Sequence, residues 1–120
     1  MNTRQHPTAL ASQFAARATG RARVGAVLQD CEDRVFSWGW CHPSSGHNGR
    51  SVHAEEHAIA RANRTRLDGA TLYVCRLTKS GYGLAKPCDA CQRLISKAGI
   101  ACVLFTVSDP SWSSYLVSPR

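Results

Sequence analysis

Four short segments rich in apolar and β-branched residues predict the strands of one sheet: residues 24–30, 34–40, 71–77 and 101–107. The first two flank a Cys-Glu-Asp turn and therefore predict a hairpin. The last two are separated by a helical pattern. Because a crossover through a helix joins parallel neighbours, these two strands are expected to lie side by side and parallel.

Helical spacing of apolar residues marks three further segments. A stripe over residues 7–19 predicts a first helix, with Gly20 closing it. A small apolar face predicts a second helix over residues 53–64. A third helix is predicted over residues 88–98, because a proline precedes it and Gly99 follows as a stop.

The pattern as a whole predicts an α/β fold: a three-layer sandwich whose mixed sheet of four to five strands carries helices on both faces. Polar loops are expected at residues 41–51 and 78–86. Residues 115–117 are expected to return as a short antiparallel edge strand or as a capping helical turn. Residues 1–120 are interpreted as one domain, since 120 residues with 43% hydrophobic content suffice for one core.

Composition and charge narrow the classes of partner. The chain has no apolar run of 18 residues or more, and its first residues lack the apolar core of a secretory signal. We therefore expect a cytoplasmic protein with no membrane partner. The formal charge is +7, and twelve of the fifteen basic residues are arginines, which suits contact with phosphate groups. This charge fits a phosphorylated nucleotide and a nucleic-acid strand equally well.

Two short motifs carry the candidate chemistry: His53-Ala54-Glu55 and Pro87-Cys88-Asp89-Ala90-Cys91. One imidazole and two thiolates give a zinc ion three protein ligands and leave a fourth position open, as in catalytic zinc sites. Cys88 and Cys91 share a face only if their segment is helical. At a helix N-terminus, the dipole is expected to lower the pKa of both thiols.

The spacing H-x-E followed by P-C-x-x-C is the motif pair of zinc deaminases. On these residues the chain resembles the cytidine and deoxycytidylate deaminase superfamily over about residues 24–107. The resemblance implies one catalytic zinc ion per chain on His53, Cys88 and Cys91. It implies that Glu55 moves protons from the activated water to a leaving ammonia. It also implies that Ala54 accommodates the carbonyl edge of the base through its small size and backbone N–H.

Several simpler interpretations stay open for individual residues. Cys88 and Cys91 are also compatible with a redox pair or with core thiols that bind no metal. His57 is interpreted as a helix-face residue, and Glu56 as a solvated or structural partner. The other cysteines are compatible with core packing, with a Cys31–Cys41 disulfide, or with a second metal held together with His42 and His47.

Three functions remain open from the sequence. The first is deamination of a free cytosine nucleoside or nucleotide, with Trp40 as a candidate substrate-binding residue. The second is deamination of a base in single-stranded DNA or RNA, with Trp40, Tyr82 and Trp112 as stacking surfaces. The third is a non-catalytic zinc-binding interaction module. The first is favoured because 120 residues leave little surface to guide a strand. A homo-oligomer is expected, because an uncovered sheet edge invites pairing.

Overall fold

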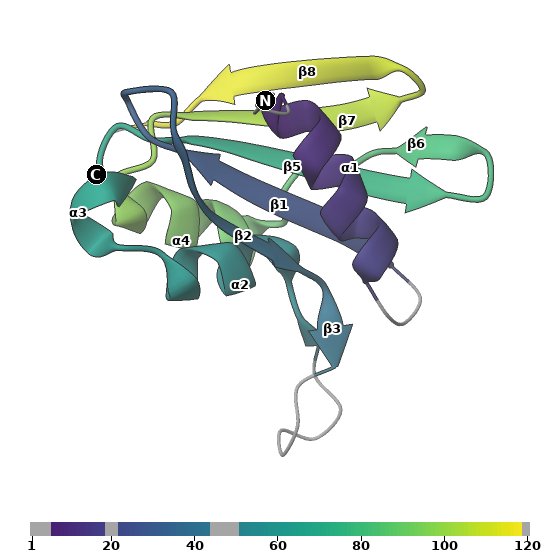
Figure 1. Cartoon of the computed structure of the whole chain (residues 1–120), viewed down its shortest axis with the longest axis horizontal. Coiled ribbons are helices and arrows are strands. Elements are labelled where there is room, and N and C mark those ends of the chain that lie inside the picture. The colour runs from purple at the N-terminus through teal and green to yellow at the C-terminus, as the bar shows by residue number, and fades with distance from the viewer. Residues whose placement is uncertain (1–5, 19–21, 44–50, 119–120) are drawn as a thin grey trace, which may run out of the picture.

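A mixed sheet forms the centre of the computed structural model, which describes residues 6–18, 22–43 and 51–118 (Figure 1). The main path of the sheet is β2-β1-β5-β7-β8, and β6 pairs with β5 beside it. The strands are Arg23–Gln29 (β1), Val35–Trp40 (β2), Thr71–Thr78 (β5), Gly81–Gly83 (β6), Cys102–Ser108 (β7) and Ser111–Leu116 (β8). Strands β5 and β7 are parallel, as predicted, and the other described pairings are antiparallel.

Helices cover both faces of this sheet, which confirms the predicted three-layer α/β sandwich (Figure 1). Helix α1 (Pro7–Arg17) lies on one face, and α2 (Ala54–Arg61) and α4 (Asp89–Ala98) lie together on the other. A single turn, α3 (Arg64–Leu67), follows α2. Two very short strands, β3 (His42–Pro43) and β4 (Ser51–Val52), form a separate pair ahead of α2.

The alternation of side chains along the strands creates two cores. On β1, Ala26 and Leu28 face α2 and α4, whereas Val27 faces α1. On β5, Leu72 and Val74 join the α2 and α4 side in the same way. Because side chains alternate between the two faces of the sheet, the position of a residue in its strand determines the face on which its side chain lies.

Glycines let both helical layers approach the sheet at backbone contact. A Cβ atom on Gly39 of β2 would lie 2.6 Å from the backbone nitrogen of Ala58 and 2.8 Å from the carbonyl oxygen of Ala54, both in α2. A Cβ atom on Gly25 of β1 would overlap the backbone nitrogen of Ala15 in α1. Because no larger residue fits, these glycines set the depth of α2 and α1 on the sheet.

Some details of the structure differ from the sequence-based expectation. The helix expected over residues 53–64 ends at Arg61, because Asn63 accepts a hydrogen bond from the N–H of Thr65 at 3.0 Å and caps the separate helix α3. The segment expected as a loop over residues 78–86 contains β6, so the sheet has six strands instead of four to five. The expected stop at Gly20 lies outside the described residues.

The C-terminal segment is an edge strand, one of the two forms expected for it. Strand β8 runs antiparallel to β7 along the edge of the sheet.

The alternative of a Cys31–Cys41 disulfide is wrong. Both thiols are free, because Cys31 lies in the hairpin turn and Cys41 at the far end of β2. None of the described helices is long and apolar enough to cross a membrane.

Candidate functional site

His53 is the residue immediately before α2 and has an extended backbone. The Glu56 carboxylate accepts a hydrogen bond from the backbone N–H of His53 at 3.3 Å, as in half of a capping box. Glu56 therefore has a structural role, one of the two expected for it. The contact holds the start of α2, and with it the imidazole of His53, in place.

Cys88 and Cys91 occupy the N-cap and the first turn of α4. The side-chain amide of Gln92 donates a hydrogen bond to the carbonyl oxygen of Pro87 at 2.9 Å, which ties the approach to the helix. The helix ends at Gly99, whose φ of 87° is left-handed, as predicted for a glycine stop. The two thiols thus project from one end of a short, well-delimited helix.

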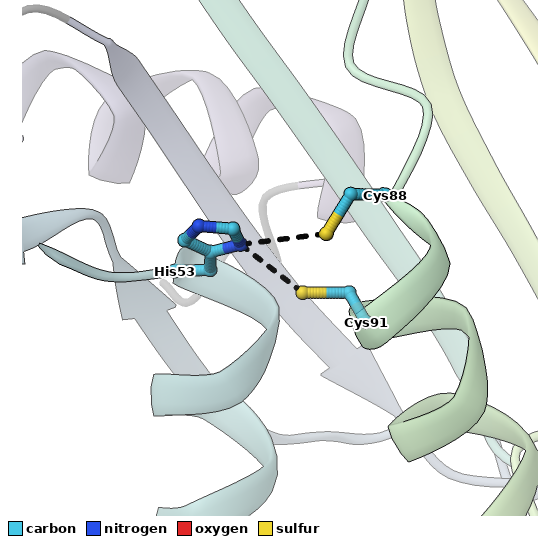
Figure 2. A group of neighbouring side chains, drawn as sticks. All are labelled: His53, Cys88 and Cys91. Carbon is cyan, nitrogen blue, oxygen red and sulfur yellow. Dashed lines mark hydrogen bonds between the residues drawn. The ribbon is translucent and has the colours of Figure 1, made fainter. Parts of the chain in front are cut away.

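The imidazole and the two thiols meet at one point, although His53 and Cys88 are 35 residues apart in sequence (Figure 2). His53 Nδ1 lies 3.3 Å from the Sγ atom of Cys91 and 3.8 Å from that of Cys88. The three candidate ligand atoms lie within 4.8 Å of one another. Ligands at about 2.0 and 2.3 Å from one tetrahedral zinc ion would be about 3.5 Å apart, so this donor set fits zinc.

The electrostatic environment of Cys91 differs from the expectation of a lowered thiol pKa. Burial raises the pKa of Cys91, and the carboxylate of Glu55 and the thiol of Cys88 add to the effect. Burial and the neighbouring acidic groups thus dominate the pKa of this thiol. A coordinated cation reverses this balance, because metal binding deprotonates a thiol outright.

Glu55 is buried, with 6% of its surface exposed, although it is one residue away from the exposed Glu56. Burial raises the pKa of Glu55 above its ordinary value of 4.5, against the opposing effects of a backbone hydrogen bond and of His53. A carboxyl group with a raised pKa can both accept and donate a proton near neutral pH. Glu55 thus has the environment expected of a general acid–base group.

A pocket of about 260 Å³ joins these groups on the α2 and α4 side of the sheet. Candidate ligands His53 and Cys88, the buried Glu55 and the small Ala54 all line it. Its other walls come from the strands and from the segment before α4: Ala22, Val24, Cys41, Ser51, Arg76, Leu84, Ala85 and Lys86. The structure therefore brings together five of the six residues predicted from the sequence, counting Cys91 through its contact with His53.

Comparison with known protein families gives the family of the chain. Residues 1–107 match the family model described as the cytidine and deoxycytidylate deaminase zinc-binding region. The chain belongs to this family. The matched family model is a zinc-binding region, and the His/Cys/Cys donor group has the spacing of a metal site. Both observations identify zinc as the cofactor.

Individual relatives agree with this family. A deoxycytidylate deaminase of Mycobacterium phage D29 is 42% identical over 55 residues, which are 46% of this chain and 36% of the phage protein. The fold is similar to that of cytidine deaminase from Burkholderia pseudomallei, with a TM-score of 0.72, 22% identity, and coverage of 92% of this chain and 90% of that one. The dCMP deaminase of cyanophage S-TIM5 gives a TM-score of 0.65 at 25% identity, over 84% of this chain and 79% of that one.

Trp40 is the one predicted site residue that the structure places outside the pocket and its metal-ligand group. Its ring stacks on Phe14 of α1 at a centroid distance of 5.9 Å, and it does not line the pocket. Trp40 pairs with Gly25, which faces α1, and its indole also lies edge-on against His57 of α2 at a centroid distance of 5.0 Å. Trp40 is therefore absent from the pocket lining, and its role as a substrate-binding residue stays a prediction.

His57 is a helix-face residue, as the sequence indicated. Its Nδ1 atom accepts a hydrogen bond from the backbone N–H of Trp40 at 3.2 Å, and its ring packs against His42. Burial lowers the pKa of His57, with a further contribution from His42.

The second metal site considered with His47 falls partly outside the described residues. Within the described residues, His53, Cys88 and Cys91 form the one cluster with metal-ligand spacing.

Among the pocket residues that sequence reasoning did not select, three have ionisable side chains: Cys41, Arg76 and Lys86. A signal for Arg76 was present, because it continues the alternation of Leu72 and Val74 and so faces the same side of β5. Lys86 directly precedes the Pro-Cys motif, but its proximity to the pocket depends on the path of the segment after β6.

Proposed function

We propose that the protein is a zinc-dependent hydrolytic deaminase of a free cytosine nucleoside or nucleotide. The observation that carries this proposal is the convergence of a His/Cys/Cys donor group and a buried carboxyl group on one pocket. Three ligands with an open fourth position are typical of catalytic zinc sites. The phage relative, a deoxycytidylate deaminase, supports the same class of substrate.

His53, Cys88 and Cys91 would hold the zinc ion, since their donor atoms have the spacing of one tetrahedral site. When bound, zinc supplies Lewis acidity that lowers the pKa of a water molecule to about 7 and makes it a ready nucleophile. The hydrogen bond from the backbone N–H of His53 to the Glu56 carboxylate fixes the start of α2. Glu55 of the same helix therefore faces the pocket in which the substrate would react.

Glu55 carries the protons of the reaction. The amino group at C4 of cytosine leaves as ammonia while oxygen from water forms the new carbonyl, with no change of oxidation state. Glu55 takes a proton from the attacking water and delivers protons to the ring nitrogen and the departing amine. Its buried environment, which raises its pKa, suits a group that must hold a proton between these transfers.

Ala54 and the size of the pocket favour a free substrate. Ala54 is fully buried at the first position of α2, where a backbone N–H has no partner within the helix and can face a carbonyl edge of the base. A pocket of about 260 Å³ is small for a ligand site. Tyr82 and Trp112, the other stacking candidates for a polymer, pack against each other and against the core between the sheet and α1. The described residues that line the pocket include no Phe, Trp or Tyr.

The test is a panel of free nucleosides, nucleotides and single-stranded oligonucleotides incubated with zinc-loaded protein. Conversion is followed by ammonia release and by mass spectrometry of the base. We expect conversion of a cytosine nucleoside or nucleotide and none of the oligonucleotides at physiological salt. Conversion confined to oligonucleotides would replace this proposal with the polymer reaction, and no conversion of any substrate would favour the interaction module.

The metal assignment is tested by elemental analysis. Cys88→Ser and Cys91→Ser are expected to lose most of the zinc that wild-type protein holds at one ion per chain. Cys31→Ser is the matched control, because this thiol is exposed in the hairpin turn, away from the pocket. Full zinc occupancy in both ligand variants would contradict the assignment.

A further inference from the structure

Thr106 is a polar residue of β7 that is fully buried, although it does not line the pocket. Its side chain and its backbone both contact the segment that leads from β6 to the candidate metal ligand Cys88. We propose that Thr106 is a positioning residue, which holds one wall of the pocket at the distance from Glu55 and the zinc ligands that the substrate requires. This inference rests on the proposed function, because it concerns substrate binding in the same pocket.

The position of Thr106 follows from a change of partner along β5. Strand β5 pairs with β7 up to Val74, which lies opposite Phe105. From Arg76 onward β5 pairs with β6 instead, with Gly83 opposite Arg76 (Figure 1). The ladder between β5 and β7 therefore ends between these two points. The place at which it ends, formed by Arg76, Gly83 and Thr106, is the strand fork.

At the strand fork the side chain of Thr106 replaces the missing bonds between strands. Its Oγ1 atom accepts a hydrogen bond from the backbone N–H of Arg76 at 3.0 Å and donates one to the carbonyl oxygen of Gly83 at 2.7 Å. A hydroxyl group can do both at once, because it carries one donor and two acceptor sites. The hydroxyl group of Thr106 thus joins β5 and β6 to β7.

The backbone of Thr106 extends this connection toward the pocket. Its carbonyl oxygen accepts a hydrogen bond from the N–H of Ala85 at 2.9 Å. Ala85 is buried and lines the pocket, together with its neighbours Leu84 and Lys86. Residues 84–86 are the anchored wall of the pocket, because β7 holds the chain at Gly83 and again at Ala85.

Cys88 has a separate anchor at the end of this segment. It is the N-cap of α4, and the side-chain amide of Gln92 donates a hydrogen bond to the carbonyl oxygen of Pro87 at 2.9 Å. Loss of the Thr106 hydroxyl group therefore displaces the anchored wall while the metal ligands stay in place. The expected consequence is weaker substrate binding with little change in the chemical step, which raises KM and leaves kcat nearly unchanged.

The first measurement is steady-state kinetics of zinc-loaded Thr106→Val, which removes the hydroxyl group and keeps a similar shape. We expect KM for the cytosine substrate to rise about fivefold or more, with kcat within about twofold of wild type and an unchanged zinc content. Thr106→Ser, which keeps the hydroxyl group, should restore KM. Thr78→Val is the matched control, because the Thr78 hydroxyl group bonds to Gly81 at the tip of the same hairpin and does not reach the pocket lining.

A lower kcat at unchanged KM in Thr106→Val would indicate a smaller fraction of folded protein and would overturn the positioning role. The same holds for an unchanged KM and kcat. A rise in KM that Thr106→Ser shares would show that the shape of the side chain matters and the hydroxyl group does not.

The second measurement is exchange of backbone amide hydrogens followed by nuclear magnetic resonance, which requires no turnover. We expect the amides of residues 83–86 to exchange about tenfold faster or more in Thr106→Val than in wild type, with the amides of β1 unchanged. This result supports the anchor even if no cytosine is converted, in which case only the proposed function fails. Equal exchange of residues 83–86 in both proteins, with deamination observed, would overturn the positioning role and leave the function standing.

The Arg76 amide of the wild-type protein provides a test that needs no variant, in case Thr106→Val does not fold. Slow exchange of this amide supports its hydrogen bond to Thr106 at the strand fork. Exchange at the rate of an unstructured peptide would overturn the proposal.

Discussion

Glu55 and Glu56 are adjacent glutamates with opposite environments. Glu55 is 6% exposed and lines the pocket, whereas Glu56 is exposed and caps the start of α2 through the N–H of His53. Because neighbouring residues of a helix point in different directions, one carboxyl group faces the pocket and the other reaches the backbone. The pair therefore allows a catalytic role to be separated from a structural one.

Glu55→Gln is expected to keep zinc and fold yet lose about 10²–10⁴-fold in kcat, because the amide cannot carry protons. Glu56→Gln is the matched control and should keep activity, with at most a small loss of thermal stability, since an amide oxygen can still accept the capping hydrogen bond. Steady-state kinetics, zinc analysis and thermal melts of both variants decide this. Activity of Glu55→Gln within about threefold of wild type would assign the proton transfers to another group.

Asp30 links the β1–β2 turn to α3. Its carboxylate accepts hydrogen bonds from the N–H groups of Arg34 at 3.0 Å and Glu32 at 2.9 Å, and it pairs with Arg66 at 2.8 Å. These contacts, the bond from Arg34 first among them, lower the pKa of Asp30 below its ordinary value of 3.8. A lowered native pKa stabilises the fold above pH 3.8, and this stabilisation is lost as pH falls through the native pKa.

Asp30→Asn is therefore expected to melt at a lower temperature than wild type at neutral pH. The difference should shrink below about pH 3.8, where wild type loses its advantage. Glu32→Gln serves as the control, because the Glu32–Arg34 pair is exposed and should contribute little. Thermal melts across this pH range measure the effect; a constant difference at every pH would show that the charge of Asp30 is not involved.

At the scale of elements, the depth of α2 on the sheet positions the candidate site. Gly39 lies against the backbone of Ala54 and Ala58, so Gly39→Ala must push α2, and with it His53 and Glu55, away from β2. We expect a stability loss of about 1–3 kcal/mol together with weaker zinc binding.

Gly25→Ala is the matched control, because it displaces α1 on the opposite face. It should cost similar stability but leave zinc affinity of the folded protein unchanged. Denaturant unfolding and competition with a chelator separate the two effects. Equal zinc affinity in both variants would mean that the site does not depend on the seating of α2.

The elements that the sequence predicted are those with a long apolar period: helices α1, α2 and α4, and strands β1, β2, β5 and β7. Strand β6 was missed because Gly81-Tyr82-Gly83 is too short to show alternation and is stabilised by its pairing with β5. The end of α2 was placed too late because Asn63 was not recognised as the cap of a new turn.

The residues of the candidate site also fall into those that the sequence predicted and those that it did not. Residues carried by a motif, His53, Cys88 and Cys91, meet in space as predicted. The position of Trp40 outside the pocket lining was not predictable, because the phase of β2 relative to its two helical layers is set by tertiary packing, which a single strand pattern does not encode. Arg76 and Lys86 were missed because β6, which separates them in sequence, brings them to one opening only once the hairpin is formed.

At the scale of the whole molecule, the sheet has exposed apolar side chains near both ends of its path. Leu116 on β8 is 82% exposed, and Trp38 on β2 is 36% exposed. Edge strands with apolar side chains favour association. We expect a homo-oligomer, with a mass by light scattering that is a multiple of 13.1 kDa, and a shift toward smaller species in Leu116→Lys. A mass of 13.1 kDa at micromolar concentration would contradict this expectation.

The placement of the candidate ligands at the starts of α2 and α4 also has a thermodynamic consequence. These helices belong to different crossovers of the chain, so an ion shared by His53 and the two cysteines ties together segments that separate when the protein unfolds. Free zinc then acts as a stabilising ligand, worth about 2.7 kcal/mol at a concentration 100 times its Kd. The melting temperature therefore rises with the concentration of free zinc and can be used to measure zinc affinity. The rate at which a chelator removes zinc reports how often α2 and α4 separate by local opening.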